Sequence, residues 1–346
     1  MSDSNKLPPE VAFLLEAAGS APSADNSQPW CFEWDGHTLT ARVHRRGGFP
    51  EDYHATTLAL GAATENLAWA IQSLGLDMAS WFFGPPGAGG AFAQGRVTKP
   101  STIPAVNDMP LWKQRHTNRL PYRPEIDSGV ADKLATCRVG KVEVRVMAGA
   151  AIRQAADWVR QASEVRFQTR EVNEWFAASL RYGDSPEDLI SGLHVDTLAL
   201  PPGGVGLLKL MSDWGRLQWL NRLRAYKLFA AIEAANFRKA PLVIAIIGPT
   251  DRAAAFDAGR CLQRVWLKVT ELGLSAQPYY VVADLLNRLE SNSVPTQCVT
   301  QSSALQARIR AEYGHENTLH CLLRVGKPVG EIQVSGRLPL NEIMCT

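Results

Sequence analysis

A polar loop near the N-terminus carries the residue types best suited to binding a ligand. Residues 21–30 read Ala-Pro-Ser-Ala-Asp-Asn-Ser-Gln-Pro-Trp and place hydroxyl and amide side chains between two prolines. Proline stiffens the backbone, and hydroxyl and amide groups both donate and accept hydrogen bonds. This chemistry suits a planar ligand with a polar edge better than it suits catalysis by a strong acid or a nucleophile. The alternative interpretation is a stiff surface turn that precedes a strand.

A second cluster, Arg115-His116-Thr117-Asn118-Arg119, carries cations at alternate positions. On an extended backbone Arg115, Thr117 and Arg119 lie on one side, where two guanidiniums and a hydroxyl form a fork for phosphate. His116 alternates away from that side, which favours a structural position for it. Taken alone, the pattern favours a solvated basic turn over a phosphate site.

Composition excludes several classes of protein. The 346 residues include 36 basic and 34 acidic side chains, and a net charge of +2 predicts neither a nucleic-acid nor a membrane partner. Residues 1–6 lack the apolar core of a signal peptide, and no apolar run reaches membrane-spanning length. The six cysteines and seven histidines are scattered, which indicates no metal site, no disulfide framework and a reducing cytoplasm.

Hydrophobic periodicity and turn residues predict a mixture of helices and strands. Gly and Pro between 84 and 107 indicate a linker, and 182–204 is expected to be irregular. For the amphipathic segment 205–236, a core or lid helix is favoured over a membrane-surface helix. Helices are predicted over 9–18, 57–76, 150–181, 205–236 and 253–272, and strands over 30–34, 38–44, 241–247 and 320–325.

One internal echo stands out. Residues 61–76 and 259–274 both begin with glycine, carry apolar residues at helical spacing and reach Leu-Gly-Leu after the same interval. Glycine at the start of a helix permits close approach of another backbone, and glycine at its end permits a left-handed cap. Two related halves fused in one chain would produce this echo, and so would chance agreement between two amphipathic helices.

Together the motifs resemble those of the nitroreductase superfamily of FMN proteins, along most of the chain. The greatest likeness is to its Acg-like branch, mycobacterial proteins with two fused nitroreductase-like halves. The resemblance implies an α+β, internally duplicated pseudo-dimer of antiparallel or mixed sheets with flanking helices. It also implies that Arg115, Thr117 and Arg119 hold the FMN phosphate. The first loop would reach the flavin ring through Pro22, Ser23, Asn26 and Gln28.

Two further segments match the family. Residues 273–281, Gly-Leu-Ser-Ala-Gln-Pro-Tyr-Tyr-Val, resemble the segment whose backbone amides meet the flavin edge, so the resemblance places Pro278, Tyr279 and Tyr280 along the ring. Tyrosines replace the usual glutamate; they could donate a proton to substrate, or pack in the core. Near the C-terminus the family resemblance offers three more cations beside the phosphate, with ordinary surface positions as the alternative: Arg324, Lys327 and Arg337.

The two predicted halves are unequal. Residues 1–105 carry the flavin-ring loop, whereas 106–346 carry the phosphate segment and a possible lid over 185–236. Each half keeps one part of the site, which predicts one FMN per chain. The internal fusion is compatible with a monomer or with a homodimer.

The resemblance implies an FMN-dependent oxidoreductase that transfers hydride between flavin and a small conjugated or heterocyclic substrate. NAD(P)H is the expected donor, and the reaction could equally run oxidatively in a biosynthetic pathway. Because flavin brings the hydride chemistry, neither a metal nor a covalent nucleophile is needed. Two alternatives stay open: an FMN storage protein with little turnover, and an interaction protein that kept the fold and lost the cofactor.

Overall fold

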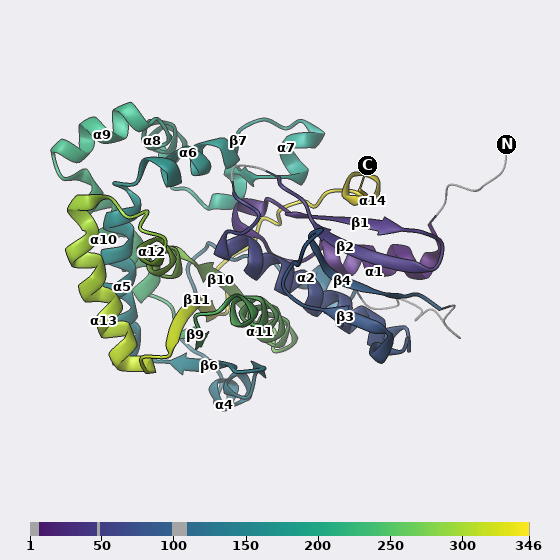
Figure 1. Ribbon diagram of the computed structural model, residues 1–346. Coiled ribbons are helices and arrows are strands. Elements are labelled where there is room, and N and C mark those ends of the chain that lie inside the picture. Colours follow the sequence, from purple (N-terminus) through teal and green to yellow (C-terminus); the bar gives the residue numbers. More distant parts are fainter. Residues whose placement is uncertain (1–6, 47–48, 99–108, 346) are drawn as a thin grey trace.

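The computed structural model describes residues 7–46, 49–98 and 109–345 (Figure 1). In this part of the chain, two antiparallel sheets lie side by side, each covered by helices. The α+β class expected from the sequence is therefore confirmed. Residues 1–6, and 99–108 of the predicted linker, lie outside the described residues.

The first sheet has four strands in the described part of the chain, in the order β1-β2-β4-β3. The predicted hairpin is confirmed, since β1 pairs antiparallel with β2 and Gly36 takes a φ of +95° in the turn. The linker prediction is wrong over Ala91–Arg96, where the chain forms β4 beside β2. The strands of this first sheet and the two helices that pack beside it are α1 (Pro9–Gly19), β1 (Trp30–Trp34), β2 (Thr38–Val43), α2 (His54–Ser73), β3 (Trp81–Phe83) and β4 (Ala91–Arg96).

The second sheet has the strand order β10-β11-β9-β6-β5 among the described residues. Along the central strand β9, Val243 and Ala245 enter the core on one face, and Ile244 and Ile246 enter the core on the other. This alternation explains why β9 reads as an unbroken apolar run in the sequence. The strands are β5 (Arg138–Val139), β6 (Val142–Met147), β9 (Leu242–Pro249), β10 (Ser275–Tyr279) and β11 (Asn317–Gly326).

Helices cover both faces of this second sheet, which buries β9 completely except at its end. One face packs against α4 (Val130–Ala135) and α11 (Arg252–Glu271). The opposite face packs against α5 (Ala150–Arg166), α12 (Val281–Glu290) and α13 (Val299–Tyr313). The short helix α3 (Leu111–Gln114) precedes the predicted phosphate segment.

The two long predicted helices are each interrupted. The helix expected over 150–181 is broken at residues 167–169 into α5 and α6 (Arg170–Ser179). The helix expected over 205–236 is three helices, because Asp213 caps a new helix through the Arg216 amide and Arg224 takes a left-handed φ of +62°. These helices are α8 (Gly204–Ser212), α9 (Trp214–Arg222) and α10 (Ala225–Arg238).

Residues 182–204 hold more regular structure than expected. A helix, α7 (Pro186–Ile190), starts at the cap Ser185, whose hydroxyl accepts from the Asp188 amide. The strands β7 (Leu180–Arg181) and β8 (Leu193–His194) form a short parallel pair. A 3-10 helix follows over Val195–Leu198. No helix of the described ranges is long and apolar enough to cross a bilayer.

The echoed helices α2 and α11 pack directly against each other. A Cβ atom added at Gly259 would overlap the carbonyl oxygen of Leu58, and one added at Gly61 would overlap that of Phe256. The two glycines therefore let the helix backbones touch where they cross. Buried polar contacts flank the crossing, including a hydrogen bond of 2.6 Å from the Gln263 amide to Asn66 Oδ1.

The C-terminal arm, residues 327–345, returns from the second sheet to the first (Figure 1). Its helix α14 (Leu340–Ile343) places Ile343 in the core of the first sheet, and the Cys345 amide donates to the Phe32 carbonyl at 2.8 Å. A disulfide joins Cys345 to Cys31. The expectation of no disulfide framework is wrong for this pair, since 314 residues of separation hide the pairing from the sequence.

Candidate functional site

One cavity of about 680 Å³ lies where the two sheets and the C-terminal arm meet. Its size falls within the range of small-molecule sites. The first loop, the Arg115–Arg119 segment, the start of α12 and the C-terminal arm all contribute to its wall. Of the predicted site residues, ten line it: Pro22, Ser23, Asn26, Arg115, Thr117, Arg119, Pro278, Tyr279, Tyr280 and Arg337.

The first loop is held in an unusual backbone conformation. Asp25, Asn26 and Gln28 have φ angles of 50°, 55° and 48°, which non-glycine residues seldom adopt. Left-handed residues persist only where surrounding contacts hold them, and they cluster at functional sites. Here the Ser23 hydroxyl accepts a hydrogen bond of 2.9 Å from the backbone N–H of Gln28 across the turn. The loop is therefore built to present Ser23–Asn26 to the cavity.

Gln28 holds this loop from behind instead of lining the cavity. Its side chain is fully buried and donates to the Ile190 carbonyl at 2.8 Å. Its carbonyl oxygen accepts from the Leu338 amide at 2.9 Å. One amide side chain thus joins the loop, the last residue of α7 and the C-terminal arm.

The Arg115–Arg119 segment runs alongside β10. Thr117 forms a parallel bridge with Ala276, and the Asn118 amide donates to the Ala276 carbonyl at 2.9 Å. This pairing places the predicted phosphate segment next to Pro278. Asn118 is buried, whereas Thr117 and Arg119 face the cavity, as the alternation of an extended backbone predicts. The expectation that His116 alternates away from that side is wrong, because His116 also lines the cavity.

Arg115 connects this segment to the first loop. Its guanidinium donates to the Ser20 carbonyl at 2.9 Å, just before that loop, and lies 4.5 Å from the ring centre of Trp266. Only 4% of the residue is exposed, and its Nε has no hydrogen-bond partner among the described residues. Burial, followed by the charge of nearby Arg337, holds the Arg115 pKa well below its usual range. An anion in the cavity would offset both the burial of the Arg115 charge and its repulsion by Arg337.

Arg337 and Arg119 add two more cations. Arg337 donates to the Asn26 side-chain oxygen at 2.9 Å, and its Nε also lacks a partner in the described structure. Burial lowers the Arg337 pKa to about 10. Arg119 donates to the Thr197 carbonyl at 3.0 Å; burial lowers its pKa, while Asp25 and then Tyr279 oppose that shift. The three predicted guanidiniums thus line one cavity, which favours an anionic group on its ligand.

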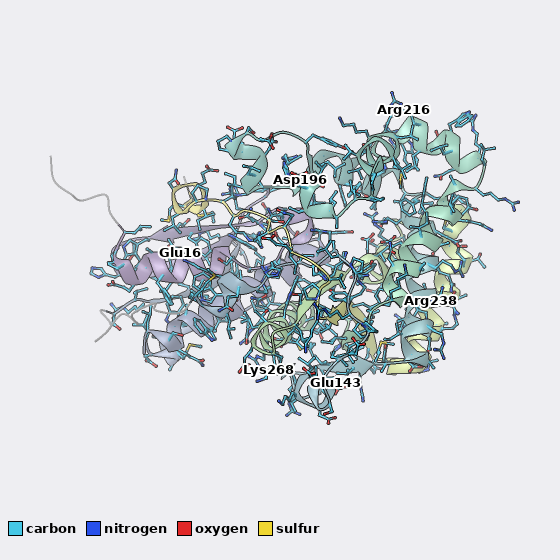
Figure 2. All side chains as sticks on the ribbon, turned by 180° about the vertical axis from the view of Figure 1, so that it is seen from behind. Glu16, Glu143, Asp196, Arg216, Arg238 and Lys268 are labelled. Atoms are coloured by element: carbon cyan, nitrogen blue, oxygen red, sulfur yellow. A yellow bond between two sulfur atoms is a disulfide. The ribbon has the colours of Figure 1, made fainter. Side chains whose placement is uncertain are left out.

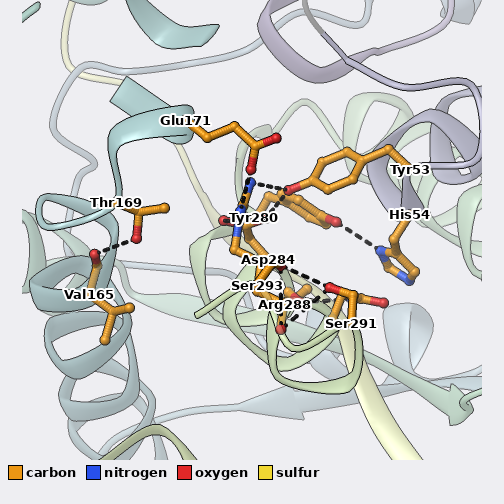
Figure 3. Close-up of polar contacts among 12 residues, drawn as sticks. Tyr53, His54, Val165, Thr169, Glu171, Tyr280, Asp284, Arg288, Ser291 and Ser293 are labelled. Carbon is orange, nitrogen blue, oxygen red and sulfur yellow. Dashed lines mark hydrogen bonds and ion pairs between the residues drawn. The ribbon is translucent and has the colours of Figure 1, made fainter. Parts of the chain in front are cut away.

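A chain of hydrogen bonds begins at Tyr280, whose contact with His54 is marked in Figure 3. His54 Nδ1 lies 3.0 Å from the Tyr280 hydroxyl, and His54 Nε2 lies 2.9 Å from His320 Nδ1. His320 Nε2 lies 3.0 Å from the Pro249 carbonyl, which only accepts. His320 Nε2 must therefore carry a proton, so neutral His320 accepts from His54 and neutral His54 accepts from Tyr280.

Burial supports this neutral arrangement. It lowers the His320 pKa to about 4 and, with the His320 charge as a second cause, holds the His54 pKa well below its usual value. It also raises the Tyr280 pKa well above 10. The hydroxyl proton of Tyr280 is thus committed to His54, which leaves its oxygen as an acceptor.

Aromatic rings form a second wall of the cavity. Ring centres of Phe49, Tyr53 and Trp175 lie 5.1–5.8 Å apart. Arg288 lies over Trp175 at 5.1 Å and pairs with Asp284 at 3.2 Å and Glu171 at 2.8 Å. The Tyr53 hydroxyl also donates to Asp284 (Figure 3). This network joins α6 to α2 and α12 and provides a flat, apolar surface on that side.

Two predicted cations lie outside the cavity wall. Arg324 is buried under Tyr122 and Tyr279 and donates to the Asn236 carbonyl at 2.7 Å. Lys327 is half-buried and pairs with Asp127 at 3.1 Å. Arg324 therefore supports the chain around β11, and Lys327 occupies an ordinary surface position.

Sequence reasoning missed several residues of the cavity. Asp25 lies within the first loop, at a position where the family motif specifies no residue type. Burial raises the Asp25 pKa to about 6, and a hydrogen bond from Ser179 and the charges of Arg119 and Arg166 oppose this shift. Arg166 and Glu233 also line the cavity and pair at 2.8 Å. Their helical positions are typical of surface ion pairs, so the local sequence carried no signal for them. The missed aromatic and apolar lining includes Phe49, Tyr53, Trp112, Trp175, Phe176 and Trp266.

Comparison with known proteins gave one curated relative and several solved structures. No family model matches the chain. An uncharacterized protein of Mycobacterium tuberculosis is 27% identical over 285 residues, which cover 78% of this chain. The chain spans only 38% of the length of that relative.

The solved structures are FMN-dependent nitroreductases and related flavoproteins. The nitroreductase NfnB from Mycobacterium smegmatis, in complex with NADPH, is 16% identical with a TM-score of 0.38, covering 68% of this chain and 96% of that one. A BluB-like flavoprotein from Clostridium difficile 630 is 13% identical with a TM-score of 0.38, covering 69% and 99%. A nitroreductase with bound FMN from Desulfitobacterium hafniense DCB-2 is 12% identical with a TM-score of 0.35, covering 69% and 99%.

Proposed function

We propose that this chain is an FMN-dependent oxidoreductase. The observation that carries the proposal is the convergence of Arg115, Arg119 and Arg337 on one cavity beside Ser23 and Asn26. Arg337 comes from a position more than two hundred residues after Arg115 and Arg119 in the sequence. Their convergence supports the phosphate assignment, which the local Arg-x-Thr-x-Arg pattern supported only weakly.

The residues present fit FMN. Arg115 and Arg337 each keep a buried Nε without a partner among the described residues, and a phosphate would supply acceptors for both. Trp112 and Trp266 add flat apolar area to the wall, which suits a planar ring. Ser23, Asn26 and the Pro278–Tyr280 backbone offer polar groups for the ring edge. FMN, when bound, supplies the hydride-transfer chemistry.

The chain's own residues bind, orient and exclude water. We assign phosphate binding to Arg115, Thr117, Arg119 and Arg337. Tyr280 lines the cavity with its hydroxyl proton held by His54, so it orients a ligand by accepting a hydrogen bond. The wall formed by α6 and the 3-10 helix over Val195–Leu198 keeps water from the buried guanidiniums.

The two halves would together make one site. The first loop belongs to residues 1–105, whereas the phosphate segment and the lid belong to 106–346. The packed glycines of α2 and α11 support a duplication, because equivalent helices of a pseudo-dimer would meet at equivalent positions. We therefore propose one FMN per chain, in a monomer or a homodimer. A cytoplasmic location stays a prediction.

NAD(P)H is the proposed electron donor, and a small conjugated or heterocyclic molecule the proposed substrate, in either direction of hydride transfer. The aromatic wall of Phe49, Tyr53 and Trp175 supports a flat, largely apolar partner. A second candidate function, FMN storage, is favoured by one observation: the lid segment 185–236 contributes Leu193, Leu198 and Glu233 to the wall and so covers the cavity.

Flavin loading and reduction test these proposals in sequence. The purified chain is incubated with FMN and separated from free flavin, and bound flavin is measured by absorbance. A chain that takes up no FMN contradicts both oxidoreductase and storage functions. Stopped-flow bleaching by NADH or NADPH, then reoxidation by quinone or nitro acceptors, supports the oxidoreductase. Bound flavin that neither bleaches nor reoxidises supports storage instead.

Arg119→Ala tests the phosphate assignment at a single residue. Loss of one charge-assisted contact, worth about 1.5–3 kcal/mol, is expected to weaken FMN binding about tenfold to a hundredfold. Riboflavin, which lacks the phosphate, should bind wild type and variant alike. FMN affinity that does not change would place the phosphate elsewhere.

A further inference from the structure

The outer helical segment, residues 204–239, has a local excess of positive charge. It holds seven lysines and arginines against two carboxylates, a net charge of +5, whereas the whole chain has only +2. The rest of the chain is therefore net negative. The small whole-chain charge, which predicted no membrane partner, hides this separation.

These cations are free in the structure. None of the seven forms an ion pair with a described carboxylate, and all seven are exposed. The Lys209 ammonium lies over the Tyr182 ring at 4.8 Å. Figure 2 shows Arg216 at the upper edge of the molecule and Arg238 lower on the same side.

Large apolar side chains stand between the cations. Trp219 is 59% exposed and Leu223, four residues later, is 71% exposed; Leu228 and Ile232 on α10 are 61% and 51% exposed. A spacing of four residues places Leu228 and Ile232 on one face of α10, and Leu223 directly follows the last residue of α9. Buried Leu217, Ala230 and Ala234 hold the opposite faces against the protein. The outer face of α9 and α10 thus exposes apolar area that none of the described residues covers.

We propose that the outer face of α9 and α10 docks on an anionic membrane surface. Exposed tryptophan and leucine insert at the boundary between headgroups and acyl chains, and surrounding lysines and arginines meet anionic headgroups. The sign of the segment matches such a surface. The helices lie at the edge of the molecule in Figure 1, where a flat surface reaches them.

A second copy of the chain fits this face less well. A two-fold dimer through the segment would bring the same patch against itself, placing +5 opposite +5. A bilayer of opposite charge has no such repulsion. The exposed leucines and isoleucine also suit acyl chains better than nucleic-acid bases, which stack on aromatic rings.

Docking would place the cavity near the bilayer. Glu233 of α10 lines the cavity and pairs with Arg166, whereas Leu228 and Ile232 of the same helix face outward. One helix therefore separates the proposed flavin site from the proposed membrane face. The docking proposal does not depend on the flavin, since it rests on the outer face alone.

Vesicle co-sedimentation of the full chain tests the proposal. Vesicles of phosphatidylcholine alone are compared with vesicles of phosphatidylcholine mixed with phosphatidylglycerol, at low and high salt. We expect the bound fraction to favour the anionic vesicles by about tenfold or more and to fall as salt screens the charges. Equal binding to both vesicle types, or none to either, would overturn the proposal.

Variants distinguish binding through this face from non-specific adsorption to vesicles. The Trp219→Ser, Leu223→Ser double variant and the Arg216→Gln, Arg222→Gln, Lys227→Gln triple variant should each lose anionic-vesicle binding. The control Phe82→Ser removes a side chain that is 54% exposed on β3 and should bind as wild type. An unchanged thermal midpoint verifies that each variant is folded.

Sedimentation velocity without lipid provides the competing outcome. A concentration-dependent dimer that the Trp219→Ser, Leu223→Ser variant abolishes, together with no vesicle binding, would assign the face to a second copy. A monomer that binds anionic vesicles supports the membrane proposal.

Discussion

Arg337 donates a hydrogen bond of 2.9 Å to the side-chain oxygen of Asn26, although 311 residues separate them in the chain. The Asn26 amide in turn donates to the Gly336 carbonyl at 3.2 Å. The C-terminal arm thereby completes the wall that the first loop begins. These contacts make the C-terminal arm part of the site.

Replacing Arg337 should weaken FMN binding. Arg337→Ala removes a buried guanidinium from the proposed phosphate site, and we expect about a tenfold to hundredfold higher Kd. Fluorescence titration with FMN measures it. Lys327→Ala is the matched control, since Lys327 lies on the same arm but pairs with exposed Asp127. Equal losses from both variants would contradict a specific contact.

The disulfide should hold this arm in place. Cys345→Ser removes a link that closes a loop of more than three hundred residues, with an expected loss of about 2–4 kcal/mol in the free energy of unfolding. FMN affinity should fall as well, because Arg337 lies eight residues before Cys345. Reductant should reproduce both effects in wild type and add nothing in the variant.

Cys137→Ser is the control for that experiment, because Cys137 is a free, half-buried cysteine. It should match wild type with and without reductant. A wild-type chain that reductant leaves unchanged would show that the arm is held by its other contacts.

The crossing of α2 and α11 should tolerate no side chain larger than hydrogen. Gly259→Ala places a methyl group against the Leu58 carbonyl, and we expect a loss of about 1–3 kcal/mol or more from overpacking. Urea unfolding measures the change. Gly206→Ala on α8 meets nothing within 4 Å and should be neutral or slightly stabilising. A neutral Gly259→Ala would contradict the close crossing.

The buried histidine pair should make the fold sensitive to acid. The His320 pKa is lowered to about 4 in the fold, so between pH 6.5 and 4 the unfolded chain binds more protons than the folded chain. Stability from this group is present above pH 6.5 and is lost as pH falls toward 4. The loss is at most about 3 kcal/mol.

Free energies of unfolding measured between pH 4 and 7 test this sign. His320→Gln does not titrate, so its stability should depend less on pH than that of wild type, even where the variant is less stable overall. His315→Gln replaces an exposed histidine and should keep the wild-type slope. Parallel pH profiles for wild type and His320→Gln would contradict the buried neutral pair.

Local sequence patterns anticipated much of the scaffold. The first helix, the Asp-Gly hairpin, β9, α11 and β11 all follow from periodicity and turn residues that act within a few positions. The same reasoning failed over 150–181 and 205–236. Apolar residues continue there at helical spacing, whereas the Asp213 cap and the left-handed Arg224 break the helix.

The candidate site was likewise predicted only in part from local sequence. Its first loop and Arg-x-Thr-x-Arg segment were visible as short motifs, and ten of the thirteen predicted residues line one cavity. Gln28 belongs to the motif but faces inward, because its amide joins three backbone segments. A motif specifies residue types; the packing around it decides which of them meet the ligand.

The sequence by itself determined which functional groups are present: amides and hydroxyls in a stiff loop, and arginines at alternate positions. It also determined the two echoed helical segments that begin with glycine. Only the tertiary structure decided that Arg337 joins Asn26, that Cys31 pairs with Cys345, and that the Tyr280 hydroxyl donates a hydrogen bond to His54. Each of these contacts joins residues hundreds of positions apart. Periodicity in the sequence reports only on residues a few positions apart. These partners meet because the two sheets and the C-terminal arm pack together.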